Sequence, residues 1–318
     1  MSASVPVAGV DVGGTNIEVG LVGDDHEVLD RAKAPTPTDG PEAVLDTIAS
    51  LVGDLDEEPL AVGVGIPGVV HDGAVLTVPN LEGWGDSFDL VGALGERLGG
   101  VPLALGNDAN VGLLGEWVAG AAAGGRNVLG LWLGTGVGGG LILDGRPYTG
   151  SRGAAGEIGH VVVLEGGALC SCGRRGCVEA YAGRRMMASA AAAMHDAGRD
   201  TELFAIADDE GKPRPTSGVW ARALDEGDAL ATELVDSAVD RIGVAVGSAV
   251  NLLDLDTVVV GGGLAEKLGQ DLADRVAEAA GPWMLRPSPD LRFVVSELAD
   301  DAGVVGAASL GRATLLGG

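Results

Sequence analysis

Residues 9–22 read GVDVGGTNIEVGLV, and residues 130–143 read GLWLGTGVGGGLIL. The two stretches align without gaps, and each runs from an apolar strand through a glycine-rich turn into a second strand. Around the first stretch, the pattern predicts strands at 5–10, 17–22, 27–34 and 60–66 and a helix at 41–55. This order is βββαβ. A repeat of such a unit predicts an α/β protein with two similar halves.

Each glycine-rich turn has a physical use. Small residues let backbone N–H groups approach phosphate oxygens, and threonine hydroxyls add donors. One predicted phosphate clamp comprises Gly13, Gly14 and Thr15, followed by Asn16, and the other comprises Gly134, Thr135 and Gly136. Two plain hairpin turns are the simpler alternative. The matching positions in a repeated unit favour phosphate binding.

The cysteines form a second pattern. Cys170, Cys172 and Cys177 are the only three in the chain, and His160 precedes them by ten positions. Structural zinc takes four nitrogen or sulfur ligands, so this set predicts a zinc-binding loop. A local disulfide with a spare thiol, or three ordinary reduced cysteines, are the alternatives. The odd count, without a secretion signal, argues against a disulfide framework.

The rest of the chain supplies further elements. The pattern predicts strands at 101–105, 257–260 and near 291–295, and helices at about 111–122, 178–195, 228–253 and 301–316. Residues 200–225 show little periodicity and contain Gly-Lys-Pro-Arg-Pro. We therefore expect an irregular surface segment there.

The loop motifs identify a family resemblance. Glu157-Ile-Gly-His160, followed by C-x-C-G-x-x-G-C-x-E at 170–179, resembles the signature of the ROK family of sugar kinases and sugar-responsive repressors. Six motifs in the family's order extend this resemblance over nearly the whole chain. It implies an actin-like ATPase (ribonuclease H-like) duplication, with two α/β domains around a cleft. The expected domains are 1–105, with a helix at about 301–318 packing back on it, and 106–300, with the zinc loop at 160–177.

The resemblance also implies a sugar site. Its expected residues are Gly65, Asn80, Asn107, Asp108, Glu157, His160 and Glu179. Within this set, Asp108 is the expected catalytic base, Asn107 binds a hydroxyl, and His160 serves both zinc and a sugar hydroxyl. Helix capping is the simpler role for Asn107 and Asp108, and ordinary loop positions are the alternative for Gly65 and Asn80.

The expected ATP site follows from the turns and the resemblance together. Its residues are Asp11, Gly13, Gly14, Thr15, Asn16, Gly134, Thr135, Gly136, Gly261, Gly262 and Gly263. The resemblance places Asp11 near the nucleotide's Mg²⁺, through water. It places Gly261–Gly263 against adenosine, which is compatible with a tight strand-to-helix corner.

Composition limits the classes of partner. The 318 residues include 20 basic and 46 acidic side chains, for a net charge of −26, with only three lysines. This excess resembles proteins of a molar-salt cytoplasm, and an ordinary acidic protein is the alternative. The absence of a basic stripe argues against nucleic-acid binding. No signal peptide pattern is visible, and the longest apolar stretch, 242–253, is too short to cross a bilayer. We therefore expect a soluble, cytoplasmic protein without a membrane partner.

The predicted function is ATP-dependent phosphorylation of a hexose. Glucose is the first choice, as the usual substrate in this family, and the family implies a homodimer or homotetramer. Alternative enzymes are kinases for another hexose or for N-acylmannosamine, and a polyphosphate-using glucokinase. A ROK-type sugar-sensing regulator without kinase activity is the alternative from another class, and a non-catalytic sugar-binding scaffold is a third. The first strand, at about residue 5, leaves no room for a preceding DNA-binding motif, and Asp108 is present.

Overall fold

The computed structural model describes residues 5–77, 83–85, 87–286 and 288–316. The strands are β1 (Val7–Val12), β2 (Asn16–Val22), β3 (Val28–Pro35), β4 (Val62–Ile66), β5 (Val69–His71), β6 (Ala74–Thr77), β7 (Phe88–Asp89), β8 (Leu103–Asn107), β9 (Val128–Leu133), β10 (Val137–Leu143), β11 (Arg146–Pro147), β12 (Thr257–Gly261) and β13 (Arg292–Val295). The helices are α1 (Pro41–Gly53), α2 (Leu90–Arg97), α3 (Asp108–Ala119), α4 (Glu179–Ala182), α5 (Arg184–Asp196), α6 (Leu203–Asp209), α7 (Ser217–Asp225), α8 (Ala229–Leu253), α9 (Gly263–Leu268), α10 (Gln270–Ala280) and α11 (Asp301–Leu315).

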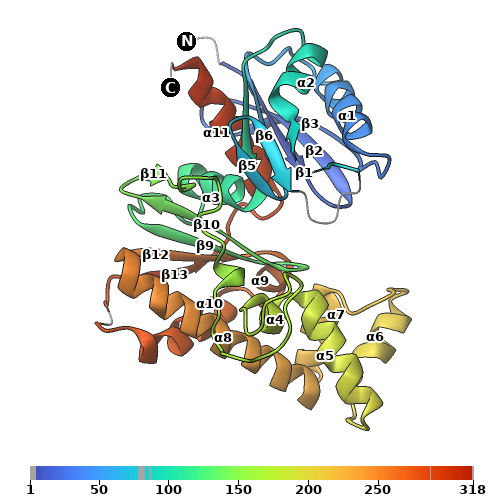
Figure 1. Cartoon of the computed structure of the whole chain (residues 1–318), viewed down its shortest axis with the longest axis vertical. Coiled ribbons are helices and arrows are strands. Elements are labelled where there is room, and N and C mark those ends of the chain that lie inside the picture. Colours follow the sequence, from blue (N-terminus) through green and yellow to red (C-terminus); the bar gives the residue numbers. More distant parts are fainter. Residues whose placement is uncertain (1–4, 78–82, 86, 287, 317–318) are drawn as a thin grey trace.

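Two five-stranded sheets share one topology. Their strand orders are β3-β2-β1-β4-β8 and β11-β10-β9-β12-β13. In each sheet the first three strands form an antiparallel meander, and the last two run parallel to the innermost strand of that meander. The predicted duplicated α/β fold is therefore confirmed. Figure 1 shows the first sheet in the upper part of the molecule and the second in the lower part.

The two turns of the repeat differ in length by one residue. Val12 pairs with Ile17, which leaves the four residues 13–16 between the paired ends of β1 and β2. Leu133 pairs with Val137, which leaves only residues 134–136 in the second. Turn length fixes hairpin register, so the gapless alignment of the two stretches is wrong beyond the turn.

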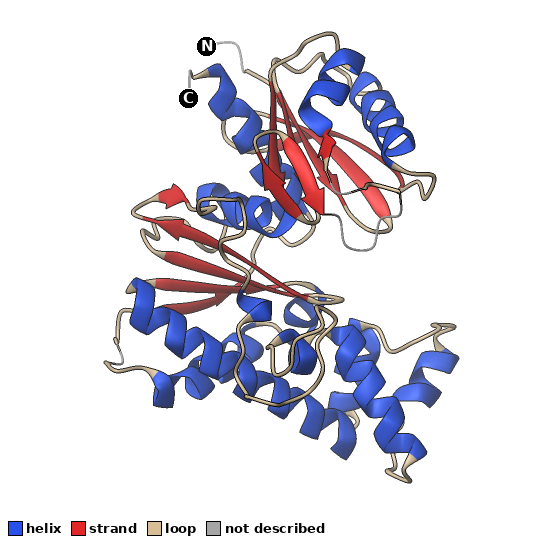
Figure 2. Ribbon diagram, viewed as in Figure 1, coloured by secondary structure: helices blue, strands red, loops and turns tan. Residues whose placement is uncertain are grey.

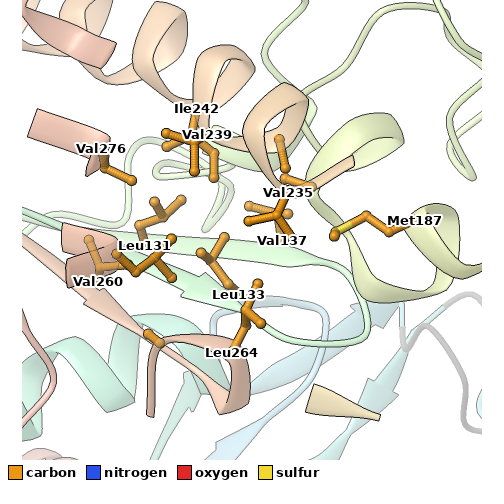
Figure 3. Packing of buried hydrophobic residues seen from close by; sticks show 14 of the residues in the cluster. Leu131, Leu133, Val137, Met187, Val235, Val239, Ile242, Val260, Leu264 and Val276 are labelled. Carbon is orange, nitrogen blue, oxygen red and sulfur yellow. The ribbon is translucent and has the colours of Figure 1, made fainter. Parts of the chain in front are cut away.

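The larger hydrophobic core lies between the second sheet and its helices. Figure 2 shows α3 on one side of this sheet and α8 with α10 on the other. Val235, Val239 and Ile242 follow the i, i+4, i+7 spacing of one helix face, and Figure 3 shows them pointing toward Leu131 and Val260 of the sheet. The second sheet is thus covered on both faces.

The last helix packs on the first sheet. α11 contacts β1 and β4 and lies along α3. Glycines permit this close approach, because a Cβ at Gly9, Gly63 or Gly115 would overlap a carbonyl oxygen of α11. The chain therefore returns from the second sheet to the first through α11. The domain boundaries at 105 and 300 stay predictions.

Several predicted helices differ in detail. The helix expected at 178–195 is divided at Gly183 into α4 and α5. The prediction of an irregular segment at 200–225 is wrong, because these residues include the helices α6 and α7. These helices have seven and nine residues, so neither is long enough to display a clear helical period.

Other elements were not predicted at all. They include the small sheet β5-β6-β7, the strand β11 and the helices α2 and α10. The helix α9 begins at the strand-to-helix corner expected at Gly261–Gly263. No helix within the described ranges is long and apolar enough to span a membrane.

Asp256 connects the starts of β9 and β12, which lie side by side. Asp256 accepts hydrogen bonds from the backbone N–H groups of Arg126 (2.8 Å) and Asn127 (2.7 Å) and from the Thr257 hydroxyl (2.8 Å). Burial alone would raise the pKa of Asp256, but these hydrogen bonds and the Arg292 charge lower it. Asp256→Ala should therefore reduce the free energy of unfolding by about 1 to 3 kcal/mol at neutral pH.

Urea titrations of Asp256→Ala and the native protein measure this difference. Asp240→Ala, which removes the same charge from an exposed helix position, is the control and should change little. A lowered folded pKa stabilises the protein above the unfolded value of about 3.9. The difference in stability between the native protein and Asp256→Ala should thus stay constant down to about that pH and become smaller below it. Equal stability of the two variants at neutral pH would contradict the assignment.

Candidate active site and metal centre

An open cleft of about 1280 Å³ contains most of the predicted site residues. Those that line it are Asp11, Gly13, Gly14, Thr15, Asn107, Asp108, Gly134, Thr135, Gly136, Glu157, His160, Glu179 and Gly262. Cys172 lines it as well, whereas Cys170 and Cys177 are buried. The two glycine turns, the start of α3 and the cysteine loop therefore meet in one place.

Four described residues of the predicted sugar and ATP sites do not line this cleft, and the predicted Asn80 lies outside the described residues. Asn16 belongs to β2 rather than to the lining. Gly65 is buried in β4, where a Cβ would press against Val111 at 3.2 Å. A Cβ at Gly261 would overlap the Trp132 ring, and one at Gly263 would lie 2.8 Å from the Ser217 hydroxyl. Packing alone thus explains the three glycines.

The phosphate turns contain two glycines that packing does not explain. A Cβ at Gly14 or Gly134 would meet no atom within 4 Å, and neither residue has a positive φ. The first turn is braced by Thr36, whose N–H donates to Thr15 (2.9 Å) and whose hydroxyl donates to Gly13 (2.6 Å). Open space above a braced turn suits close approach of a phosphate oxygen.

Asn107 and Asp108 have different roles at the start of α3. Asn107 is the N-cap, and its side-chain oxygen accepts from the Asn110 N–H (3.1 Å). Its amide donates to the Gly68 carbonyl (3.0 Å) and to Asp108 Oδ1 (2.9 Å). The Ala109 N–H also donates to this Oδ1 (2.8 Å). Among the described residues Asp108 is therefore held through Oδ1 alone, and Oδ2 is left to accept a proton.

Carboxylates are concentrated around this point. Burial raises the pKa of Asp108, and the nearby Glu157 raises it further, against the hydrogen bonds that lower it. Burial likewise raises the pKa of Asp11 to about 7, with contributions from Asp108, Glu18 and Asp300. Such mutual repulsion is relieved by a hard divalent cation with carboxylate and water ligands, so these residues fit Mg²⁺.

Glu179 connects the second turn to the cysteine loop. Its Oε2 accepts from the Val137 N–H (3.1 Å), and its Oε1 accepts from the Ser171 hydroxyl (2.5 Å). A Cβ at Gly136 would overlap this carboxylate. Glycine is therefore needed at 136 for Glu179 to reach the turn.

The four predicted metal ligands lie together. The ligand atoms of His160, Cys170, Cys172 and Cys177 are all within 4.8 Å of one another. Cys172 Sγ lies 3.8 Å from Cys177 Sγ, and Cys170 Sγ lies 3.7 Å from His160 Nδ1. A tetrahedral zinc with Zn–S bonds of about 2.3 Å has S···S edges of about 3.8 Å. The donor set and these separations fit zinc, with Nε2 of His160 left for another partner.

Three arginines in the lining were missed by the sequence reasoning. Arg184 and Arg185 begin α5, and Arg214 precedes α7. The signals were available, because an adjacent arginine pair follows the cysteine motif and Arg214 stands between two prolines. The cleft therefore has a basic wall in a strongly acidic chain.

The family model of the ROK family matches residues 7–314, and the chain belongs to this family. A glucokinase of Streptomyces coelicolor is 34% identical over 313 residues, with 96% of each chain covered. An N-acetylmannosamine kinase of Citrobacter koseri is 32% identical over 305 residues, covering 95% of this chain and 97% of that one. The crystal structure of a ROK family glucokinase from Streptomyces griseus, in complex with glucose and AMPPNP, aligns with a TM-score of 0.83 at 31% identity, covering 97% of this chain and 99% of that one.

The cysteine cluster gives a metal-content prediction. The purified protein should contain about one zinc per chain, and Cys172→Ser should lose most of it, because a hydroxyl is a poor substitute for a thiolate. Glu165→Gln, at an exposed position of the same loop, is the control and should keep its zinc. Elemental analysis measures both. Full zinc content in Cys172→Ser would show that Cys172 is not a ligand.

Proposed function

We propose that the chain is an ATP-dependent hexose kinase that converts glucose to glucose 6-phosphate. The observation that carries this proposal is the position of Asp108, a buried carboxylate with one free oxygen, in a cleft that also holds both glycine turns. The glucokinases among the relatives support it over nearly the whole chain.

Asp108 acts as the general base in this proposal. A sugar hydroxyl attacks the γ-phosphorus, the bond to the leaving diphosphate breaks, and the hydroxyl proton moves to Asp108. Burial makes this carboxylate a stronger base than an exposed aspartate, because the raised pKa favours the protonated form. Asn107 and the Ala109 N–H hold Oδ1 and so orient Oδ2 toward the proton.

The remaining lining residues would bind the two substrates. Glu157, His160 and Asn107 are proposed as hydroxyl ligands, although the Asn107 amide already makes hydrogen bonds within the protein. Glu179 is proposed as a further hydroxyl ligand. The turns at 13–15 and 134–136 would bind phosphates, and Gly262 would lie beside adenosine.

Two metal ions belong to the proposal. Mg²⁺ bound with the nucleotide near Asp11 would neutralise phosphate charge. Zinc, held by His160 and the three cysteines, would fix the loop that carries Glu179 and orient His160 toward the sugar. Because all four positions of a structural zinc are filled by protein, this ion takes no part in the transfer itself.

The relatives include kinases for two classes of sugar. The N-acetylmannosamine kinase among the relatives is nearly as similar as the glucokinase, and both classes need the same base and phosphate turns. Glucose therefore stays a proposal, as do the homodimeric or homotetrameric state and the cytoplasmic location.

The acidic surface gives a salt prediction. Exposed acidic runs such as Asp56–Glu58 and Asp208–Glu210 contribute to the net charge of −26. If the chain is adapted to high salt, screening of this repulsion should raise the thermal unfolding midpoint from low to molar KCl. Differential scanning calorimetry measures it, with sucrose of equal osmolality as control. An unchanged midpoint in KCl would contradict the adaptation.

The decisive assay measures ADP formation from MgATP with a panel of hexoses in molar KCl. Native protein should prefer one sugar, and Asp108→Asn should lower kcat by about 10² to 10⁴ while hexose affinity is kept. Asp271→Asn, at an exposed position of α10, is the control.

The pH profile tests the same role. A general base must be deprotonated, so kcat/KM should fall as the pH drops through a pKa above about 4, the usual aspartate value. Turnover by Asp108→Asn close to the native rate would exclude Asp108 as the base. No turnover of any hexose by folded, zinc-containing protein would exclude the kinase proposal with ATP as donor.

A further inference from the structure

The basic wall of the cleft is fixed to the second glycine turn. The N–H groups of Arg184 and Arg185 donate to the carbonyls of Gly134 and Thr135, each at 3.1 Å. The first two residues of α5 are therefore placed by the turn itself. Any phosphate that reaches this turn enters the neighbourhood of both arginines.

The Arg184 side chain is held in the same place. It donates from Nη1 to the Ser217 hydroxyl (2.8 Å) and from Nη2 to the Thr135 hydroxyl (3.3 Å). A guanidinium group has five N–H donors, so three remain for a ligand. Ser217 is buried at the start of α7 and thus acts as a fixed support for the guanidinium.

Arg184, Arg185 and Arg214 take part in none of the ion pairs among the described residues. Glu266 also lines the cleft but makes no ion pair with them. Burial lowers the pKa of Arg184, and the Arg214 charge lowers it further. Among the described residues these guanidinium groups thus lack an ionic partner, and Arg184 and Arg214 repel each other, so an anionic ligand would supply the missing charge.

We propose that Arg184, together with Arg185 and Arg214, binds the non-transferred phosphates of the donor. The proposal rests on the proposed kinase function and adds the residues that recognise the donor. Guanidinium groups match phosphate oxygens with paired, charge-assisted hydrogen bonds. The ligand class is a linear phosphate chain, so affinity for the donor comes mainly from its phosphates rather than from its base.

Few of the glycines expected beside the adenine base line the cleft. Of the three glycines expected to meet adenosine, only Gly262 lines the cleft, whereas Gly261 packs against Trp132 and Gly263 against Ser217. Gly262 is therefore the one glycine of this run that can contact a purine in the cleft. Inorganic tripolyphosphate, which has no base, should occupy the same place as the triphosphate of ATP.

Calorimetry with MgADP and with magnesium tripolyphosphate tests the proposal. Arg184→Gln and Arg214→Gln should each weaken binding of both ligands by about tenfold or more, and adenosine binding should not change. Arg214 is exposed, so its substitution should leave the fold intact even if Arg184→Gln disturbs the turn. Arg146→Gln, exposed on β11 and outside the cleft, is the charge-matched control.

The outcomes separate this proposal from the kinase function. Phosphate-ligand affinities within about twofold of native in both variants would overturn it. So would an equal loss of glucose and MgADP affinity in Arg214→Gln, because that result indicates general damage to the cleft. Native protein that binds tripolyphosphate through Arg214 but phosphorylates no hexose would instead support the binding site and exclude the kinase.

Discussion

The hydrogen bonds around the turn at 134–136 connect the parts of the site. The carbonyls of Gly134 and Thr135 accept from the start of α5, and the Val137 N–H donates to Glu179. Glu179 in turn accepts from Ser171 in the cysteine loop. One short turn is therefore bound to a helix start and to the cysteine loop at the same time. Displacement of either would move the backbone that is proposed to face the phosphates.

A second constraint comes from the helix that joins the two halves. Asp11 lies near the end of β1 and lines the cleft, and a Cβ at Gly303 of α11 would overlap its carboxylate. The segment leading into α11 is held by the fully buried Glu116, which accepts from the Ser296 hydroxyl (2.6 Å) and from the N–H groups of Glu297 (3.1 Å) and Leu298 (2.8 Å). An unpaired buried carboxylate would be costly, so these bonds fix where α11 begins. The position of Asp11 in the cleft thus depends on contacts made at the far end of α3.

Sequence reasoning recovered the parts that local chemistry determines. The strand and turn pattern predicted the two related sheets, and the spacing of His160 and the cysteines predicted a cluster whose separations fit zinc. Sequence patterns do not report tertiary packing. Gly65 and Gly261 look like ligand-facing glycines in the sequence, but Val111 and Trp132 occupy the space beside them. Arg214 lies between two prolines in a segment without visible period, and this signal does not indicate that the fold brings it to the cleft.

Phosphate binding in the cleft needs positive charge, although the chain as a whole is strongly acidic. A triphosphate would be repelled by a chain with a net charge of −26, and Asp11 and Asp108 add negative charge inside the cleft itself. High salt screens the long-range repulsion but acts less on partly buried groups. Local positive charge is therefore required where the phosphates bind. A magnesium ion beside Asp11 would supply it on one wall, and the guanidinium groups beside Thr135 would supply it on the other. This arrangement would leave the Oδ2 atom of Asp108 available for the sugar hydroxyl, because other groups would meet the phosphate charge.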